Sequence, residues 1–233
     1  MIVNYLILEV TRRCNMCCAH CLRGNSQDVD MSRQVVDRVL QDIDEIKDVF
    51  FTGGEPSLNI PIMEYFFEQA QQKHICVGSF GLVTNGKEKQ EELVRFIKEH
   101  LSNVKEKNRC FIGMSRDQFH EPVSSNLFRQ FPFYSNEKER PNREKKTLLS
   151  EGRAEGWSGT RAPSRVGDKL WVMKYRGETV VHNELSVSAN GNILGCCDLS
   201  YKHEDGRAIG NILNEALIDI VEREYCNEFG GTK

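Results

Sequence analysis

The segment YLILEVTRRCNMCCAHC (residues 5–21) runs from apolar residues directly into four cysteines. Its apolar first part is typical of a buried strand. One reading of the cysteines is the spacing C-x-x-x-C-x-x-C, formed by Cys14, Cys18 and Cys21 with Cys17 spare. The other reading is two adjacent C-x-x-C pairs. Both place several thiols on one short loop after a strand, and the rest of the chain indicates what these thiols hold.

Composition and charge limit the class of protein. The chain has 233 residues, 39% of them apolar, which suffices for one large domain or for one domain with a small appendage. The net charge of −3 gives no general basis for nucleic-acid binding. No apolar run suits a membrane span, and the N-terminal stretch lacks the basic region and cleavage site of a signal peptide. Nine cysteines, four of them crowded together, favour a metal site in a reducing, cytoplasmic compartment over a disulfide scaffold.

Strands and helices alternate along the first half of the chain. Apolar residues three and four positions apart predict amphipathic helices, and short apolar runs between them predict strands. The expected helices are 31–46, 60–72 and 87–101, and the expected strands are 48–54, 75–86 and 110–115. Strands joined through helices form parallel sheets. We therefore expect an α/β fold, a partial (β/α)6 barrel of the TIM type with a small C-terminal cap or extension.

The alternation stops in the second half. Residues from about 136 to 165 are rich in charged residues, Gly and Ser, which predicts an exposed and mobile connection. Strand-like runs around Arg-Gly and Asn-Gly turns follow at 169–197, and 214–225 has the pattern of a final helix. We expect residues 1–165 to form the core barrel, including the connection. Residues 166–233 are expected to form the barrel end and the extension.

Three states of the cysteine loop can be compared. A zinc ion would need thiols from elsewhere, with Cys14 and Cys17 joined by distant Cys196, Cys197 or Cys226. A cubane iron–sulfur cluster is larger and accepts three thiolates from one loop, which leaves a fourth iron open to a small molecule. Free thiols are the least favoured state, because exposed thiols at this density oxidise.

A second motif, TGGEP (52–56), ends the next expected strand. Parallel strands of a (β/α) fold place their active-site loops at one face, so this motif and the cysteine loop should meet. Glycines there let the backbone approach a ligand, Glu55 offers a carboxylate to a cation, and Pro56 fixes the turn.

The cysteine spacing, followed by Gly-Gly-Glu-Pro at the second strand end, resembles the radical S-adenosylmethionine (radical SAM) superfamily over roughly residues 3–120. The resemblance implies a [4Fe–4S] cluster held by Cys14, Cys18 and Cys21, with S-adenosylmethionine (SAM) on the open iron and Cys17 at a variable position. It also implies an enzyme that cleaves SAM reductively to a 5′-deoxyadenosyl radical. A reducing partner of the flavodoxin or ferredoxin type is expected.

Further positions match parts of that superfamily that contact SAM. The motif that holds the methionine amine is matched by Gly53, Gly54, Glu55 and Pro56, and the place before the last cysteine, near the adenine, by His20. The end of the third strand is matched by Thr84 and Asn85, and that of the fourth by Ser115 and Asp117. The fourth-strand residues would contact the sugar or the methionyl group, with a capping role as the alternative. His120 is either a proton donor or a packed side chain.

The C-terminal segment 186–212 resembles the start of the SPASM/twitch extensions of radical enzymes that modify peptides and proteins. Gly191 lies five positions before Cys196, as that pattern expects. A full extension carries more cysteines than Cys196, Cys197 and Cys226. On ligand count, an auxiliary iron–sulfur cluster is therefore possible but disfavoured. The alternatives are a hairpin with buried thiols and a remnant without a cluster.

Three functions follow from these observations. The extension favours a radical enzyme that modifies a peptide or protein side chain, whereas the compact chain favours one that acts on a nucleotide or another small metabolite. The non-enzyme alternative is an iron–sulfur electron carrier or metal-binding module, in which Gly-Gly-Glu-Pro would have no task. Neither a membrane nor a nucleic acid is expected as a partner.

Overall fold

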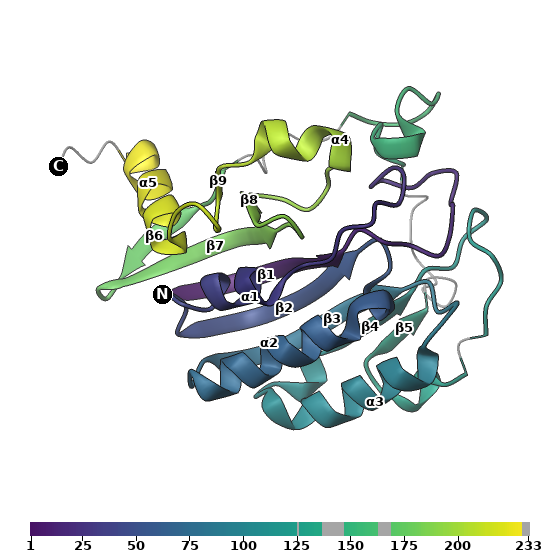
Figure 1. Ribbon diagram of the computed structural model, residues 1–233, viewed down its shortest axis with the longest axis horizontal. Coiled ribbons are helices and arrows are strands. Elements are labelled where there is room, and N and C mark those ends of the chain that lie inside the picture. The colour runs from purple at the N-terminus through teal and green to yellow at the C-terminus, as the bar shows by residue number, and fades with distance from the viewer. Residues whose placement is uncertain (125, 137–146, 163–168, 230–233) are drawn as a thin grey trace.

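The computed structural model describes residues 1–124, 126–136, 147–162 and 169–229. In this part of the chain, nine strands form one sheet in the order β5-β4-β3-β2-β1-β7-β8-β9, with β6 paired to β7 (Figure 1). Strands β1–β5 and β7 run parallel, while β6 and β8 pair antiparallel with β7, and β9 with β8. The strands are β1 Ile2–Thr11, β2 Glu45–Gly53, β3 Cys76–Thr84, β4 Phe111–Met114, β5 Tyr134–Asn136, β6 Val172–Tyr175, β7 Glu178–Val187, β8 Asn192–Leu194 and β9 Gly210–Asn211.

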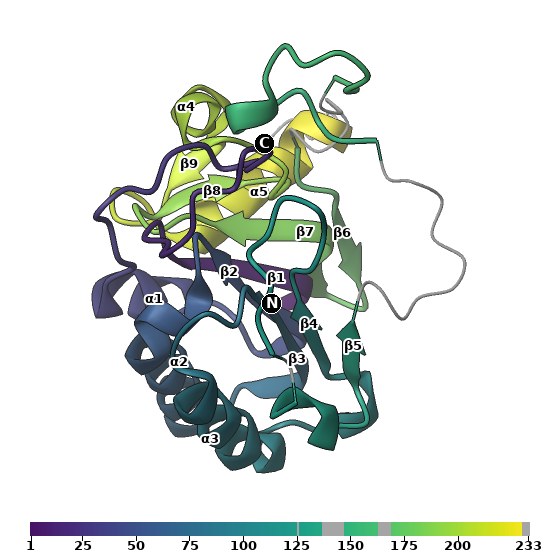
Figure 2. The ribbon, with the colours of Figure 1, turned by 90° about the vertical axis from the view of Figure 1, so that its right-hand side faces the viewer.

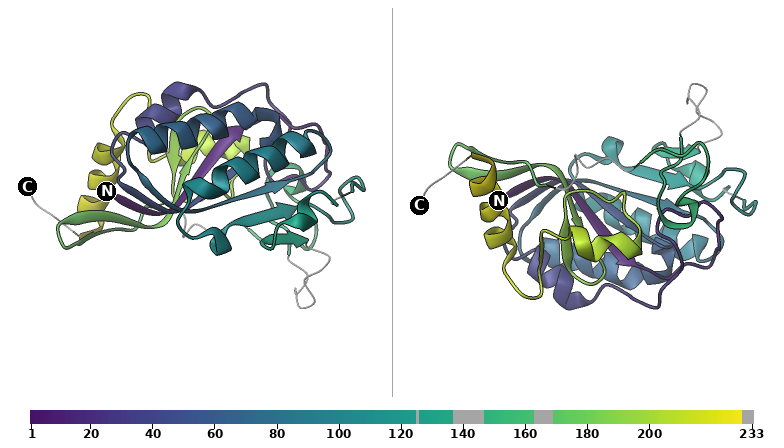
Figure 3. Two further views of the ribbon diagram at one scale, coloured as in Figure 1. Left: turned by 90° about the horizontal axis from the view of Figure 1, so that it is seen from below. Right: turned by 90° about the horizontal axis from the view of Figure 1, so that it is seen from above.

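Three helices cover one face of this sheet (Figures 2 and 3). They are α1 Arg33–Val39, α2 Ile60–Gln72 and α3 Gln90–His100. Phenylalanines from the helices and strands meet between the layers with ring centroids 5.4 to 6.0 Å apart, mostly edge to face. Burying each of them stabilises the fold by about 1.5–3 kcal/mol. These residues are Phe51, Phe66, Phe67, Phe80 and Phe96.

The sheet confirms the predicted α/β class and the partial barrel of six parallel strands. The predicted helix at 31–46 is wrong in its second half, because α1 ends at Val39 and β2 already begins at Glu45. Ile46 and Val49 are fully buried in β2, which pairs with β1 over its whole length. Strand pairing has therefore overridden the helical spacing of the apolar residues there.

The sixth parallel strand comes from the C-terminal region. β7 pairs with β1 in a register that runs from Ile2 opposite Val180 to Leu8 opposite Val187. The C-terminal region thus extends the barrel sheet itself and then continues into α4 Tyr201–Glu204 and α5 Leu217–Phe229. Between β4 and β5, the described residues hold one short 3₁₀ turn in place of a helix, so the helix–strand repeat ends earlier than a full six-unit barrel requires.

Part of the segment predicted as an exposed connection is packed. Residues 137–146 and 163–165 of that connection lie outside the described residues. In 147–162, however, Glu151 and Ala154 are only 4% and 1% exposed. The prediction of a solvated loop is wrong for residues 151–154, because the carboxylate of Glu151 and the backbone of Arg153 find partners beside α4 and in the cysteine loop. Residues 155–159 and 161–162 are exposed, as predicted.

Candidate active site

The three cysteines of the C-x-x-x-C-x-x-C spacing line one cavity of about 330 Å³ at the carboxyl ends of the parallel strands. Cys14, Cys18 and Cys21 are partly buried, whereas Cys17 is exposed and not part of the lining. Within the described residues, the three sulfur atoms do not all lie within 4.8 Å of one another, as the ligands of a single ion would. The loop therefore suits a group larger than one metal ion.

Hydrogen bonds fix the shape of the cysteine loop. The N–H of Cys21 donates to the carbonyl of Cys18 (3.1 Å), and that of Gly24 donates to the carbonyl of Cys21 (3.2 Å). The N–H of Cys14 donates to Ser26 Oγ (2.9 Å). Burial raises the pKa of the Cys14 and Cys18 thiols. Without a metal these two thiols are protonated at neutral pH, so metal binding releases their protons.

Gly53 and Gly54 end β2 directly behind the cysteine loop. Their N–H and Cα groups pack so closely on the loop that a Cβ atom on Gly53 would lie 2.1 Å from the carbonyl oxygen of Thr11. A Cβ on Gly54 would lie 2.3 Å from the carbonyl oxygen of Arg13. The sequence suggested that these glycines admit a ligand; both line the cavity, and they also admit the backbone of Thr11 and Arg13. They therefore hold the loop against the second strand.

The carboxylate of Glu55 is 1% exposed and already has three donors. Oε1 accepts from the hydroxyl of Thr84 (2.6 Å) and from the N–H of Ser57 (3.1 Å), and Oε2 accepts from the N–H of Asn85 (2.7 Å). Burial raises the pKa of Glu55, and these hydrogen bonds oppose that increase. The side chain thus joins the ends of β2 and β3, a role that its sequence position did not reveal.

Of the other predicted residues at the strand ends, some line the cavity and some lie outside it. Asn85 lines the cavity, and its Nδ2 donates to Asn15 Oδ1 of the cysteine loop (2.8 Å). Thr84 and Pro56 lie outside the lining; Thr84 supports Glu55, and Pro56 begins a buried 3₁₀ turn. Ser115 lines the cavity after β4.

His20, Asp117 and His120 form a polar group at the cavity, and the two histidines are part of its lining. Asp117 Oδ1 lies 2.8 Å from His120 Nδ1, and Asp117 Oδ2 lies 3.4 Å from His20 Nε2. Burial would raise the pKa of Asp117, but the N–H of Phe119 and the two histidines outweigh it, so that pKa is lowered. The His20 ring stacks on Phe119 with centroids 4.5 Å apart. The sequence singled out these residues separately, whereas their mutual contact depends on the tertiary fold.

A buried charged network behind the loop was not predicted. Arg12 Nε donates to Glu9 Oε1 (2.8 Å), and Arg12 Nη2 donates to Glu204 Oε1 (2.5 Å). Arg23 Nη1 donates to the carbonyl of Leu199 (2.9 Å) and lies 3.7 Å from Glu9 Oε2. Buried charges persist only when they are paired, so this network ties the start of the cysteine loop to α4. The arginines beside the cysteines were its only sequence signal.

The cysteines of the extension separate in the structure. Cys197 lines the cavity together with Asp198 and Arg23, while Cys196 is not part of the lining. Burial raises the pKa of Cys197 to about 12, so this thiol is protonated at neutral pH. Cys226 is exposed on α5, a helix that lies near the start of β1, at the other end of the strands from the cysteine loop (Figure 1).

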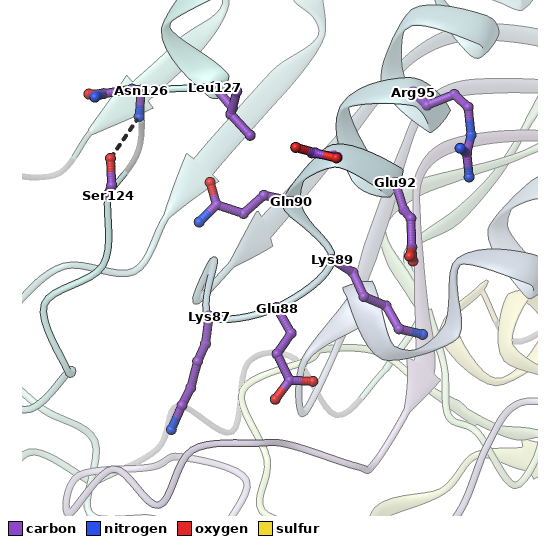
Figure 4. A pocket seen from close by; sticks show the side chains of 10 residues that line it. Lys87, Glu88, Lys89, Gln90, Glu92, Arg95, Ser124, Asn126 and Leu127 are labelled. Carbon is purple, nitrogen blue, oxygen red and sulfur yellow. Dashed lines mark hydrogen bonds between the residues drawn. The ribbon is translucent and has the colours of Figure 1, made fainter.

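A larger hollow of about 650 Å³ lies elsewhere, at the start of α3 (Figure 4). It is lined by side chains of both charges, among them Lys87, Glu88, Glu92 and Arg95, and by Ser124 and Asn126. It contains none of the thiols, and its charged side chains can be solvated in place. We assign the active site to the smaller cavity because the metal-binding and titratable groups converge there.

A partial barrel with thiols and a buried carboxylate at the carboxyl ends of its parallel strands has the architecture of a cofactor-dependent enzyme. The family model of the Radical SAM superfamily matches residues 8–106, and that of SPASM, an iron-sulfur cluster-binding domain, matches residues 179–233. The chain belongs to the radical SAM superfamily. The family predicted from the cysteine spacing and Gly-Gly-Glu-Pro is thereby confirmed.

Two curated relatives match part of the chain. The uncharacterized protein MJ0907 of Methanocaldococcus jannaschii is 32% identical over 102 residues, which cover 42% of this chain and 35% of that protein. The tungsten-containing aldehyde ferredoxin oxidoreductase cofactor-modifying protein of Pyrococcus furiosus is 29% identical over 103 residues, covering 42% of this chain and 28% of that protein. The match thus spans about a third of the length of these relatives.

A solved structure shares the fold over nearly the whole chain. Native anSMEcpe with bound AdoMet and Cp18Cys peptide aligns with a TM-score of 0.58 and 17% identity, covering 98% of this chain and 82% of that chain. Of the helices in the described ranges, none is both long and apolar enough to pass through a bilayer.

The superfamily implies a [4Fe–4S] cluster and SAM as cofactors, and the SPASM match indicates iron–sulfur binding in the C-terminal region as well. The ligand count had disfavoured such an auxiliary cluster. The main site fits its cofactor, because three partly buried thiols from one loop line one cavity. In the C-terminal region, Cys197 faces this same cavity.

Proposed function

We propose that this chain is a radical SAM enzyme that modifies a peptide or protein side chain. The observation that carries the proposal is the shared cavity, where three thiols and the buried carboxylate of Glu55 converge at the carboxyl ends of parallel strands. This is the face at which (β/α) barrels carry their active sites.

In this proposal Cys14, Cys18 and Cys21 hold the [4Fe–4S] cluster, and exposed Cys17 takes no part. Three ligands from one loop leave one iron open for SAM. When bound, the reduced cluster and SAM supply a 5′-deoxyadenosyl radical that abstracts a hydrogen atom from the substrate. The protein's task is to orient the reactants and to exclude water from them.

The amine of SAM is proposed to lie against Gly53, Gly54 and Glu55, beside Asn85. Glu55 accepts three hydrogen bonds, but a carboxylate has about four lone-pair sites, so it retains acceptor capacity for an ammonium. Pro56 and Thr84 are proposed to act from outside the lining, by fixing the turn and the carboxylate.

The adenosyl part of SAM is proposed to lie toward His20, Ser115 and Asp117. His20 and Ser115 line the cavity, and Asp117 lies within 3.4 Å of His20. Stacked His20 and Phe119 present a flat aromatic surface of the kind that suits a purine ring.

A peptide substrate is supported by two findings. The SPASM match covers the C-terminal region, and anSMEcpe, which shares the fold, is described with bound AdoMet and a Cp18Cys peptide. Val83, which is 46% exposed, gives the cavity an apolar wall that a side chain could contact. The other candidate, a nucleotide or small-metabolite substrate, is favoured by the name of the Pyrococcus furiosus relative, a cofactor-modifying protein.

The wider setting is part of the same proposal. A reduced flavodoxin or ferredoxin would supply the electron, and the nine cysteines favour a reducing cytoplasm. Residues 1–165 would act as the cofactor-binding core, and 166–233 as the barrel end and extension.

Reductive cleavage of SAM tests the proposal. The anaerobically reconstituted protein, incubated with dithionite and SAM, is expected to form 5′-deoxyadenosine and methionine slowly even without substrate, as measured by chromatography. Omitting dithionite should abolish the product. A protein with a fully loaded cluster that forms no 5′-deoxyadenosine with any reductant or substrate would instead support the electron-carrier function.

The substrate class can be separated with a size-fractionated cell extract. A peptide-modifying enzyme is expected to form 5′-deoxyadenosine faster with the high-mass fraction, and protease treatment of that fraction should remove the stimulation. Stimulation by the low-mass fraction that survives protease treatment would instead support the small-metabolite function.

A further inference from the structure

Residues 151–155 pack against the outside of the cysteine loop, and Arg153 makes most of the contact. Its N–H donates to the carbonyl of Cys21 (2.9 Å), and its Nη1 donates to the carbonyl of Cys18 (3.0 Å). Its Nε donates to Asn25 Oδ1 (3.1 Å). One arginine thus holds the backbone at two of the three proposed cluster ligands, and also the segment that follows them.

The residue before Arg153 permits this close approach. Gly152 has φ +59°, a left-handed conformation that side chains disfavour, and a Cβ atom there would lie 2.3 Å from the carbonyl oxygens of both Cys21 and Leu22. A larger residue at 152 would push the segment away from the loop. Gly152 and Arg153 therefore act together: the glycine permits the close approach to the loop, and the arginine makes the hydrogen bonds to it.

The C-terminal region holds this unit in place. The buried carboxylate of Glu151 accepts from the N–H of Ser200 (3.2 Å) and lies 3.0 Å from His203 Nδ1. Lys202 and Glu155 form a further ion pair (3.1 Å). The segment is consequently fixed between the cysteine loop on one side and α4 on the other (Figures 1 and 3).

The guanidinium also places a permanent positive charge beside Cys18, since arginine stays protonated in proteins. Because Arg153 Nη1 donates to the carbonyl of Cys18 (3.0 Å), this charge lies close enough to the Cys18 side chain to attract negative charge there. The same attraction would favour any more negatively charged state of a group bound there. For iron–sulfur clusters, net charge, hydrogen bonds and solvent exposure set the reduction potential.

We propose that Arg153 is a positioning residue of the cluster site, which fixes the cysteine loop and raises the reduction potential of the [4Fe–4S] cluster by its charge. The proposal rests on the proposed function, because it requires the cluster on Cys14, Cys18 and Cys21. It adds a residue from outside the cysteine and Gly-Gly-Glu-Pro motifs, supplied by a segment whose composition suggested an exposed connection.

The test uses the reconstituted full chain and two measurements that do not depend on activity. These are the midpoint potential from a redox titration followed by electron paramagnetic resonance, and the rate of iron release to a chelator. Arg153→Gln is expected to lower the midpoint and to release iron several-fold faster. Arg161→Gln is the matched control, because it removes the same charge from an exposed side chain in the same described stretch, 147–162.

Two further variants separate charge from position. Arg153→Lys keeps the charge but not the planar fork, so its midpoint should stay near that of the wild type while iron release accelerates. Gly152→Ala displaces the unmodified Arg153 and should lower the midpoint as Arg153→Gln does. If Arg153→Gln fails to take up a cluster, the midpoints of these two variants still test whether the charge of Arg153 raises the reduction potential.

Two outcomes overturn this inference. One is a midpoint of Arg153→Gln or Gly152→Ala equal to that of Arg161→Gln. The other is an Arg153→Lys midpoint as low as that of Gly152→Ala. Either result leaves the proposed function intact as long as the wild type shows a reducible [4Fe–4S] cluster. A wild type that takes up no such cluster is a failure of the proposed function itself.

Discussion

Cys18→Ala is expected to abolish stable assembly of the [4Fe–4S] cluster, whereas Cys17→Ala should retain it. Cys18 is partly buried and lines the cavity with Cys14 and Cys21, while its neighbour Cys17 is exposed and outside the lining. A cluster that loses one of three protein ligands has two left, and its exposed irons are open to solvent and oxygen. Cys14→Ala and Cys21→Ala should behave like Cys18→Ala.

Cys17→Ala is the control for Cys18→Ala, because both variants remove a thiol and the two positions are adjacent. The measurements are iron and sulfide content and the visible absorption spectrum after anaerobic reconstitution. A cluster that survives in Cys18→Ala and is lost in Cys17→Ala would show that Cys17 is the ligand in place of Cys18, so that the C-x-x-x-C-x-x-C register is wrong. Loss of the cluster in both variants would favour the two C-x-x-C pairs.

Glu55→Ala is expected to reduce both stability and product formation. The substitution leaves three buried donors, from Ser57, Thr84 and Asn85, without their acceptor. Each such group costs about 1–3 kcal/mol, so the free energy of unfolding should fall by on the order of 3 kcal/mol or more. The reductive formation of 5′-deoxyadenosine should fall with it, since the ends of β2 and β3 border the proposed SAM site.

Glu55→Gln separates the two roles of this side chain. It keeps the shape and one carbonyl acceptor, so chemical denaturation should show a smaller loss of stability, while the charge for the SAM ammonium is gone. Glu68→Ala, at an exposed position of α2, is the control and should change neither property. A stable Glu55→Gln variant with wild-type product formation would remove the ammonium contact from the proposal and leave Glu55 a purely structural residue.

The sequence predicted the features that local patterns determine. Apolar runs located β1 to β4, and the thiol spacing together with Gly-Gly-Glu-Pro identified the superfamily. The need for glycine at positions 53 and 54 was recognised, and both line the cavity, but their close contact with the backbone of Thr11 and Arg13 was not predicted. Sequence alone does not reveal that the carbonyl oxygens of Thr11 and Arg13 occupy the space where their side chains would be.

Features that depend on distant segments were missed. The contact between Glu151 and Ser200 joins residues 49 positions apart, and that between Arg12 and Glu204 joins residues 192 apart. Composition marked the first of these segments as solvated, because Lys, Arg and Glu are exposed in most proteins. Only the tertiary fold brings such side chains to partners that compensate for the loss of water.

The pairing of β7 with β1 has a consequence for biosynthesis. Until about residue 187 has left the ribosome, the strand that leads into the cysteine loop lacks its neighbour on one side, and its apolar edge can pair with other chains. Contacts between such distant segments form slowly, and nascent chains emerge at about 5–20 residues per second. The loop therefore spends most of translation on an unfinished sheet, and we expect the proposed cluster to assemble after synthesis, when β7 has paired with β1.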